Sequence, residues 1–367
     1  MTYSFGNNVV TGSAVSEFVN KNIAWEKKKS TNIGIDLAMF NNRFEFTAEW
    51  YKNRSEDLLY GVPVPTQTGV ANATVTMNAA SMDNSGFEFS ATYRNHDHPF
   101  KYDVSANLST LKNKVTSLGF GTKSYITGAY ATYVGQEIGQ FYGWVYKGIA
   151  RTQEELDNNA VQQGANVGDC LYEDISGPDG TPDGVIDAYD QTVLGSGLPK
   201  VNFGLSTHLE YKGFDLNIST YGVLNYHVSD DIYNSLNSCY GYGNKEVGML
   251  DANRWSEDGS TYLSSVPRTY AANNATLAWN DLFSSRKIQN AAYWKIANVE
   301  LGYNFPDKWF GGYVSGVRLY VSAQNLYTFT GYHGYNVDYA GGTFTPGYNF
   351  CSFPSARTFM CGLHFTF

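Results

Sequence analysis

The stretch PDGTPDGVIDAYD, at residues 178–190, places four aspartates close together in the chain. Like charges at this density repel one another unless water or a cation lies between them. The spacing matches the calcium-loop pattern D-x-[DN]-x-[DN]-G, which presents oxygen ligands at positions 1, 3, 5, 7, 9 and 12. Gly184 falls at position 6, where such a loop turns sharply. The sequence therefore predicts a structural Ca²⁺ site whose ligands are Asp179, Thr181, Asp183, Val185 through its carbonyl oxygen, Asp187 and Asp190.

Two features of this loop depart from an EF-hand. Position 12 is Asp190 rather than glutamate, and Pro182 occupies position 4. An aspartate at position 12 in DGxIDxxD resembles dockerin-type loops, and Asp174 is either an outer ligand or a bystander. The alternative is a plain turn rich in Asp, Gly and Pro, which these residue types form without a metal. The sequence alone leaves both interpretations open.

No other group of residues in the sequence matches a catalytic motif. The six histidines are scattered, and the GxSxG, HExxH and P-loop patterns are absent. His96 and His98 stand before Pro99 in a segment typical of a solvated turn. The cysteines lack CxxC spacing, which argues against a zinc cluster, while a disulfide between Cys170 and Cys239 stays open. We therefore expect neither an enzyme nor an organic cofactor.

The composition favours a sheet with one apolar and one polar face. Charged residues make up 16% of the 367, against about 25% in typical soluble domains, and aromatic residues also reach 16%. The mean hydropathy of -0.34 and the short apolar runs exclude a spanning helix. A net charge of -9 argues against a nucleic-acid partner. The first residues, MTYSFGNNVV, have neither the basic nor the apolar region of a signal peptide, so none is expected here.

Hydrophobic alternation with a period of two predicts about ten strands. In FEFTAEWYK, residues 44–52, apolar side chains occupy every second position. The other segments with this pattern are 32–40, 86–95, 101–110, around 140–149, 201–211, 214–223, 297–305, 317–326 and 358–367. Asn41–Asn42 and Lys212–Gly213 are hairpin signals. The remaining connections are long, at 112–138, 150–198, 225–290 and 326–355.

Short turns at one end of the strands and long loops at the other are typical of outer-membrane barrels. Aromatic residues near the strand ends suit the two membrane interfaces. The last strand alternates apolar residues up to Phe367, which in a soluble protein would form an aggregation-prone edge. We therefore predict an all-β fold, an antiparallel transmembrane β-barrel with long extracellular loops. A soluble β-sandwich or β-helix is the alternative.

Six segments, in chain order, also carry a family resemblance. They are IAWEKKKSTNIGIDLAMFNNRFEFTAEWYKNRSEDLL, ASMDNSGFEFSATYRN, GQFYGWVYKGIARTQEEL, GDCLYEDISGPDGTPDGVIDAYDQTVLGSGLPKVNFGL, YWKIANVELGYNFP and VRLYVSAQNLYTFTGYHGYNVD. Together they span nearly the whole chain and resemble the SusC/RagA family of TonB-dependent outer-membrane transporters. Two features depart from the family pattern. The insertion DISGP precedes the acidic loop. YNVDYA stands where the family usually has a carboxylate motif, so we expect Asp338 to supply that carboxylate.

The resemblance implies a barrel of about 22 strands closed by an N-terminal plug. It also implies a bacterial outer-membrane location, a SusD-like surface lipoprotein that presents an oligosaccharide or peptide, and a TonB complex that opens the plug. Residues 1–367 would then be the C-terminal part of the barrel, without plug, TonB box or signal peptide. The partners expected from the resemblance are therefore the lipoprotein, TonB, membrane lipid and the substrate.

Loop aromatics are the substrate-binding candidates that the resemblance suggests. Stacking on sugar rings is the role expected for Trp255, Trp279, Tyr240 and Tyr242, and a packing role inside the loops is the alternative. Three other functions stay open at this stage. They are a passive porin, an adhesin-type barrel and a soluble glycan-binding β-protein or enzyme.

Overall fold

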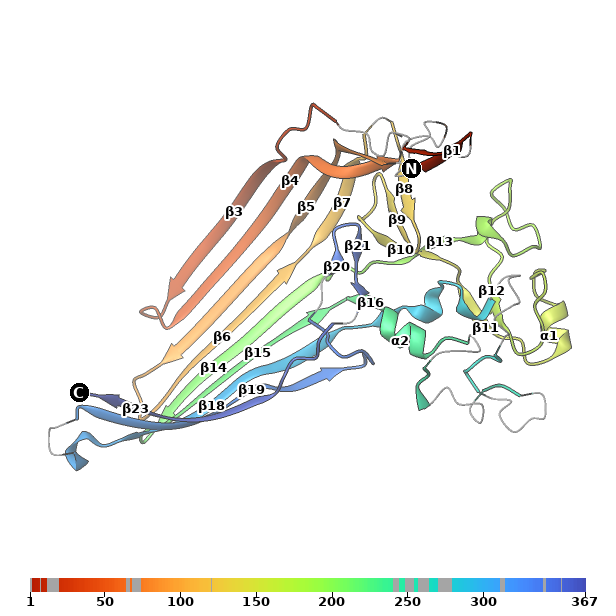
Figure 1. Ribbon diagram of the computed structural model, residues 1–367. Helices are drawn as coiled ribbons and strands as arrows, with labels where there is room; N and C mark the ends of the chain where they lie inside the picture. The colour runs from red at the N-terminus through yellow and green to blue at the C-terminus, as the bar shows by residue number, and fades with distance from the viewer. Residues whose placement is uncertain are drawn as a thin grey trace.

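The computed structural model contains one large antiparallel sheet with a group of loops at one end (Figure 1). The residues that the structure describes are 2–6, 8–11, 20–63, 67, 74–119, 121–239, 244–247, 254–256, 264–269, 279–310, 314–338, 341–350 and 352–367. The large sheet is formed by β3 (Lys27–Met39), β4 (Phe44–Pro63), β5 (Thr74–Asn95), β6 (Phe100–Thr110), β7 (Lys112–Ser117), β14 (Val201–Tyr211), β15 (Phe214–Leu224), β18 (Tyr293–Phe305), β19 (Gly316–Thr330) and β23 (Thr358–Thr366).

The strands follow one another across the sheet in the order β23-β19-β18-β15-β14-β6-β5-β4-β3, and β7 pairs with β5 beyond the end of β6. Among the described residues the sheet thus has ten strands, nine of which are strands expected from alternation. Within the described residues, β3 pairs only with β4 and β23 only with β19. The sheet is therefore open in this part of the chain, with one free edge at each side.

The strand register separates the two faces of the sheet. One row of facing residues crosses eight strands and consists of Ile35, Ala48, Phe89, Leu108, Phe203, Gly222, Trp294 and Phe329. The row one residue along consists of Asp36, Thr47, Ser90, Asn107, Gly204, Tyr221, Lys295 and Thr328. Because neighbouring residues of a strand point to opposite faces, the first row lies on an apolar face and the second on a polar face.

The apolar face is the more exposed of the two. Leu363 of β23 is 59% exposed, and other large apolar side chains of this face are exposed in the same way, among them Ile33, Leu205, Leu301 and Val321. A soluble sheet would cover such a face with another layer, since contiguous apolar surface is costly in water. The alternative of a soluble sandwich is therefore disfavoured. The pattern matches the lipid-facing side of a membrane barrel.

The polar face holds charged residues in a paired network. Arg318 of β19 donates from Nε to Asp215 Oδ2 at 2.9 Å and from Nη2 to Glu300 Oε1 at 2.7 Å. Asn304 donates to the same Asp215 oxygen at 2.9 Å. Asp215 is buried, and these donors satisfy its carboxylate. Charges inside strands are thus tolerated because they face one another on the polar side.

The short turns lie at the end of the sheet where the C-terminus lies (Figure 1). Lys212 and Gly213 both adopt positive φ, as a tight two-residue hairpin between β14 and β15 requires. Asn41 and Asn42 do the same between β3 and β4. The other described turns at this end are 96–99 and the connection after β18, which contains the 3-10 helix η7 (Asp307–Trp309).

The long connections fold into small units of their own at the opposite end (Figure 1). These units contain β8 (Ser124–Thr127), β9 (Tyr130–Tyr133), β10 (Gln140–Gly143), β11 (Tyr146–Ile149), α1 (Gln153–Asp157), β12 (Cys170–Tyr172), η2 (Ala188–Asp190), β13 (Thr192–Gly195), β16 (His227–Asp230), α2 (Asp231–Leu236), η5 (Trp279–Asp281), η6 (Ser285–Lys287), β17 (Gln289–Asn290), β20 (Gly341–Gly342), β21 (Thr345–Pro346) and β22 (Tyr348–Asn349). A further hairpin, β1 (Thr2–Phe5) and β2 (Asn8–Thr11), lies near the N-terminus.

One strand expected in the wall belongs to these loop units instead. The segment around 140–149 forms β10 and β11, which pair with β9, β13 and β12 rather than with the large sheet. The expectation was wrong because alternation of apolar residues does not distinguish a long wall strand from two short loop strands. The tenth strand of the large sheet is instead β7, which follows β6 in the chain and pairs with β5. Among the described residues, no helix is long and apolar enough to cross a membrane.

Candidate functional site

The loop after β19 turns back onto the polar face of the sheet and is held there by Asp338. The Asp338 carboxylate accepts hydrogen bonds from Lys295 Nζ at 2.6 Å and from the Tyr293 hydroxyl at 2.8 Å. The Tyr221 hydroxyl donates to both carboxylate oxygens at 3.2 Å. The Lys295 side chain is only 4% exposed, so its charge depends on this partner. Residues 331–338 are therefore anchored to β15 and β18 through an ion pair whose lysine is buried.

A second carboxylate, that of the buried Asp230, anchors the same loop at its other end. Asp230 caps α2 by accepting from the Tyr233 amide at 2.8 Å. It also accepts from Asn349 Nδ2 at 2.9 Å and from the Tyr332 hydroxyl. All three side chains, of Asp230, Tyr332 and Asn349, are buried. This cluster joins the connection after β15 to the connection after β19.

A third cluster joins the connection after β11 to the segment before η5. Arg268 donates from Nε and Nη2 to the two oxygens of Asp169, at 2.7 and 2.8 Å. Asn280 Nδ2 donates to Asp169 Oδ1 at 2.8 Å, while Asn280 Oδ1 accepts from the Cys170 amide at 2.7 Å. The fork of Arg268 matches the carboxylate in a bidentate pair. The loops thus form one connected body above the polar face.

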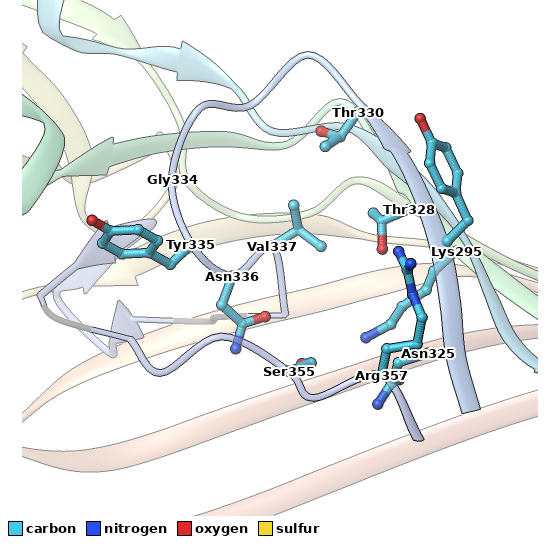
Figure 2. A pocket seen from close by; sticks show the side chains of 11 residues that line it. Lys295, Asn325, Thr328, Thr330, Gly334, Tyr335, Asn336, Val337, Ser355 and Arg357 are labelled. Atoms are coloured by element: carbon cyan, nitrogen blue, oxygen red, sulfur yellow. The ribbon is translucent and has the colours of Figure 1, made fainter. Parts of the chain in front are cut away.

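A pocket of about 340 Å³ lies between the polar face and the anchored loop (Figure 2). Figure 2 shows Lys295, Thr328 and Arg357 on one side and Tyr335 and Asn336 on the other. The lining combines amide and hydroxyl groups with two cationic side chains and two aromatic rings. Such a lining can exchange hydrogen bonds with sugar hydroxyls or peptide groups. This pocket is the candidate binding site on the wall.

The acidic loop at 178–190 is organised around Asp190, which is fully buried. Its Oδ1 accepts from the amides of Ile175 and Ser176 at 2.9 and 3.2 Å, and its Oδ2 accepts from the Asp187 amide at 2.8 Å. Asp187 in turn accepts from the Tyr189 amide at 2.7 Å, which completes a capping box on η2. Asp187 and Asp190 therefore have backbone amides as partners.

The other predicted calcium ligands are arranged differently. Asp183 Oδ1 accepts from the Val185 amide at 3.0 Å, and Asp174 Oδ2 accepts from the Gly184 amide at 2.7 Å. Asp179 and Thr181 are exposed. In the part of the chain that the structure describes, no three His, Cys, Asp or Glu side chains lie close enough to share a metal ion. Both oxygens of Asp190 already accept amide protons, so this residue does not fit the bidentate position of a calcium loop. Calcium binding stays a prediction.

The two tryptophans expected to stack on sugars are buried inside the loops. Trp279 is 4% exposed, packs against Tyr172 and Cys170, and donates from Nε1 to the Gln163 carbonyl at 3.1 Å. Trp255 is 8% exposed. A buried ring offers no face to a ligand, so the structure replaces the expected stacking role of both tryptophans with a packing role. Tyr240 and Tyr242 lie outside the described residues, and Cys170 and Cys239 are both free thiols.

Sequence reasoning identified Asp338 but missed its partners and the other anchors. Lys295 lies in the strand YWKIANVEL, where a lysine among apolar residues is a signal for a polar, inward-facing position. Asp230 directly precedes α2, where an aspartate is a common N-cap. The pair of Asp169 and Arg268 has no local signal, because 99 residues separate the partners in the chain.

A family model described as "TonB dependent receptor-like, beta-barrel" matches residues 1–326. TonB-dependent receptor P3 of Formosa agariphila is 30% identical over 99% of this chain and 36% of its own length. TonB-dependent receptor SusC of Bacteroides thetaiotaomicron is 26% identical over 100% of this chain and 34% of its own length. The chain thus spans about a third of the length of these curated relatives.

Solved structures show the same fold. The RagAB peptide transporter matches with a TM-score of 0.75 at 22% identity, covering 99% of this chain and 37% of the other. The RagAB peptide importer in its "open-open" state matches with a TM-score of 0.76 at 22% identity, covering 100% and 37%. The all-β antiparallel barrel fold expected from the sequence is therefore confirmed.

Replacing Asp190 by asparagine is expected to open the acidic loop. The side-chain amide introduced by Asp190→Asn places an N–H donor against a backbone N–H, which costs about 1–3 kcal/mol. Cleavage by a low concentration of protease within 170–195 should accelerate by about 5- to 150-fold, the factor that this cost corresponds to, measured by mass spectrometry of the fragments. The matched control Asp179→Asn alters an exposed carboxylate and should leave the rate unchanged. Chelation of the wild-type protein by EGTA separates the two interpretations of the loop. An acceleration that Ca²⁺ reverses would show bound calcium, and an unchanged rate would favour a turn without metal.

Replacing Asp338 by asparagine is expected to loosen the loop at 331–338. The change leaves the buried Lys295 ammonium without a charged partner, at a cost of about 2 kcal/mol in local opening free energy. Amide hydrogen exchange at 332, 333 and 338 should accelerate about thirtyfold, and Tyr221→Phe should change it only a few-fold. Equal exchange in wild type and Asp338→Asn would contradict the anchoring role.

Proposed function

Because this chain belongs to the TonB dependent receptor-like β-barrel family, we propose that it is part of an outer-membrane transporter of the SusC type that imports oligosaccharides or peptides. The protein is located in the bacterial outer membrane, as its family is. Its named relatives are receptors and transporters rather than enzymes. Residues 1–367 correspond in this proposal to the C-terminal part of the barrel of a longer protein.

The observation that carries this proposal is the two-faced sheet with its loops anchored across the polar side. The apolar row from Ile35 to Phe329 suits lipid, whereas the polar row from Asp36 to Thr328 suits a water-filled lumen. The free edges at β3 and β23 need further strands, because unpaired backbone groups are too costly in hydrocarbon. A larger barrel with a plug in its lumen satisfies both requirements.

Support for a polar, uncharged or weakly charged substrate comes from the pocket in Figure 2. Its hydroxyl and amide groups can replace the water around a sugar or a peptide. The RagAB neighbours are described as a peptide transporter, and SusC is described as a TonB-dependent receptor. The substrate class proposed for this chain is accordingly an oligosaccharide or a peptide.

The proposed partners are a SusD-like surface lipoprotein and the TonB complex. The long connections after β7, β15 and β19 form one body through the clusters of Asp169, Asp230 and Asp338. A rigid loop surface is suited to dock a lid protein, because little conformational entropy is lost on binding. TonB would act on the plug of the complete transporter rather than on these loops.

The test is uptake by cells whose outer membrane carries the complete transporter. Labelled oligosaccharides and peptides are supplied to wild-type cells, to cells lacking the transporter gene and to cells lacking TonB. We expect one substrate class to enter only when both the gene and TonB are present, and a SusD-like lipoprotein to co-purify with the tagged barrel. Uptake that persists in cells without TonB would indicate a passive porin. Uptake that is the same with and without the transporter gene would favour an adhesin-type barrel. Either result overturns the proposal.

A further inference from the structure

Arg286 is a cation in the loop body with no partner of opposite charge among the described residues. It lies in η6, whose backbone is fixed by hydrogen bonds from the Ser285 amide to the Trp144 carbonyl at 3.1 Å and from the Lys287 amide to the Ser284 carbonyl at 2.9 Å. Within that part of the chain, the Arg286 guanidinium forms neither an ion pair nor a hydrogen bond. A partly buried charge without a partner is costly, so this position calls for an anion.

The ionisable groups that face Arg286 do not supply this anion. They are the thiols of Cys170 and Cys239 and the hydroxyls of Tyr146 and Tyr172. Burial raises the pKa of the Cys170 thiol to about 12, and it also raises the pKa of Cys239. Burial raises the pKa of both tyrosines in the same direction. All four groups are therefore neutral near pH 7, so among the described residues they leave the positive charge of Arg286 unbalanced.

The two carboxylates beside this region are engaged elsewhere. Asp281 accepts from the Ser238 hydroxyl at 2.9 Å and from the Cys239 amide at 3.1 Å, and it lies 3.9 Å from Lys287 Nζ. Glu246 accepts from Asn237 Nδ2 at 2.8 Å. Lys287 thus has a carboxylate neighbour of its own, whereas no described carboxylate is paired with Arg286.

Arg286 lines a pocket of about 310 Å³ in the loop body. Three elements meet there, because Tyr146 comes from β11, Arg286 and Lys287 from η6, and Asn234 from α2. Asn237, which caps α2, and Tyr233 complete the polar part of the lining. The pocket therefore combines the Arg286 guanidinium, which has no carboxylate partner among the described residues, with aromatic, amide and hydroxyl groups. Its space is about the size of one sugar ring or one amino-acid residue.

We propose that this pocket binds a carboxylate of the transported substrate through Arg286. A planar guanidinium binds a carboxylate with two parallel hydrogen bonds, and one unpaired positive charge balances one carboxylate. The carboxylate belongs either to a uronic acid in an oligosaccharide or to the C-terminus of a peptide. This inference rests on the proposed transport function and adds an acidic group to the substrate.

The test uses the complete barrel protein, purified in detergent, and two matched pairs of probes. Glucuronate is compared with glucose, and N-acetyl-triglycine with its C-terminal amide, with dissociation constants measured by ligand-observed NMR. We expect at least one acid to bind ten times more tightly than its neutral counterpart. The acid that does so identifies the source of the carboxylate. No preference for either acid in the wild-type protein would overturn the proposal.

The variants assign the preference to Arg286. Arg286→Gln removes the charge at similar size and should abolish the preference, while Arg286→Lys should retain part of it. Lys308→Gln, an equal change of charge in the turn after β18, should leave the preference intact. A preference that survives Arg286→Gln would place the carboxylate elsewhere and overturn the inference. If Arg286→Gln does not fold, an unweakened preference in Arg286→Lys overturns it. Failure of this test leaves TonB-dependent uptake of a neutral substrate unaffected, so the two proposals fail separately.

Discussion

Backbone pairing in hydrocarbon is the constraint on which the rest of this structure depends. A strand in a membrane must give every N–H and C=O a partner on a neighbouring strand, so the wall consists of long antiparallel strands. Those strands can then show only two faces, since successive side chains alternate. One face meets lipid, and the other must hold all the polar chemistry. The paired network of Asp215, Glu300 and Arg318 and the loop anchor at Lys295 both lie on that second face.

Aspartates with several hydrogen-bond donors organise the loops in a recurring way. Asp169 is satisfied by an arginine and an asparagine, Asp190 by three amides, and Asp230 by an amide, a tyrosine and an asparagine. Asp338 pairs with a buried lysine and two tyrosines. A carboxylate accepts several hydrogen bonds at once, so one residue can join segments that have little regular structure of their own. The loops thereby keep a defined shape, and Arg286, which has no carboxylate partner among the described residues, departs from this pattern of paired charges.

The wall could be predicted from sequence because its signal is local. Alternation and hairpin residues such as Lys212–Gly213 fix the strands, and the resemblance fixes the family. The loops could not be predicted, because their contacts join distant residues such as Asp169 and Arg268. The spacing of aspartates that suggests calcium also serves a capping box between Asp187 and Asp190. The role of Trp279 likewise depends on its burial. The sequence does not show whether a residue outside a periodic element is buried.

The claim that the two faces of the sheet meet lipid and lumen is tested most directly along β14. Nitroxide labels are placed singly at Leu205 and Leu209, and at Ser206 and His208, in the complete barrel protein without native cysteines, reconstituted in bilayers. Electron paramagnetic resonance then measures collisions with oxygen, which concentrates in lipid, and with a water-soluble nickel complex. The account predicts high oxygen collision rates at 205 and 209 and low rates at 206 and 208, with the reverse order for nickel. Equal rates at all four positions, or the opposite alternation, would contradict it.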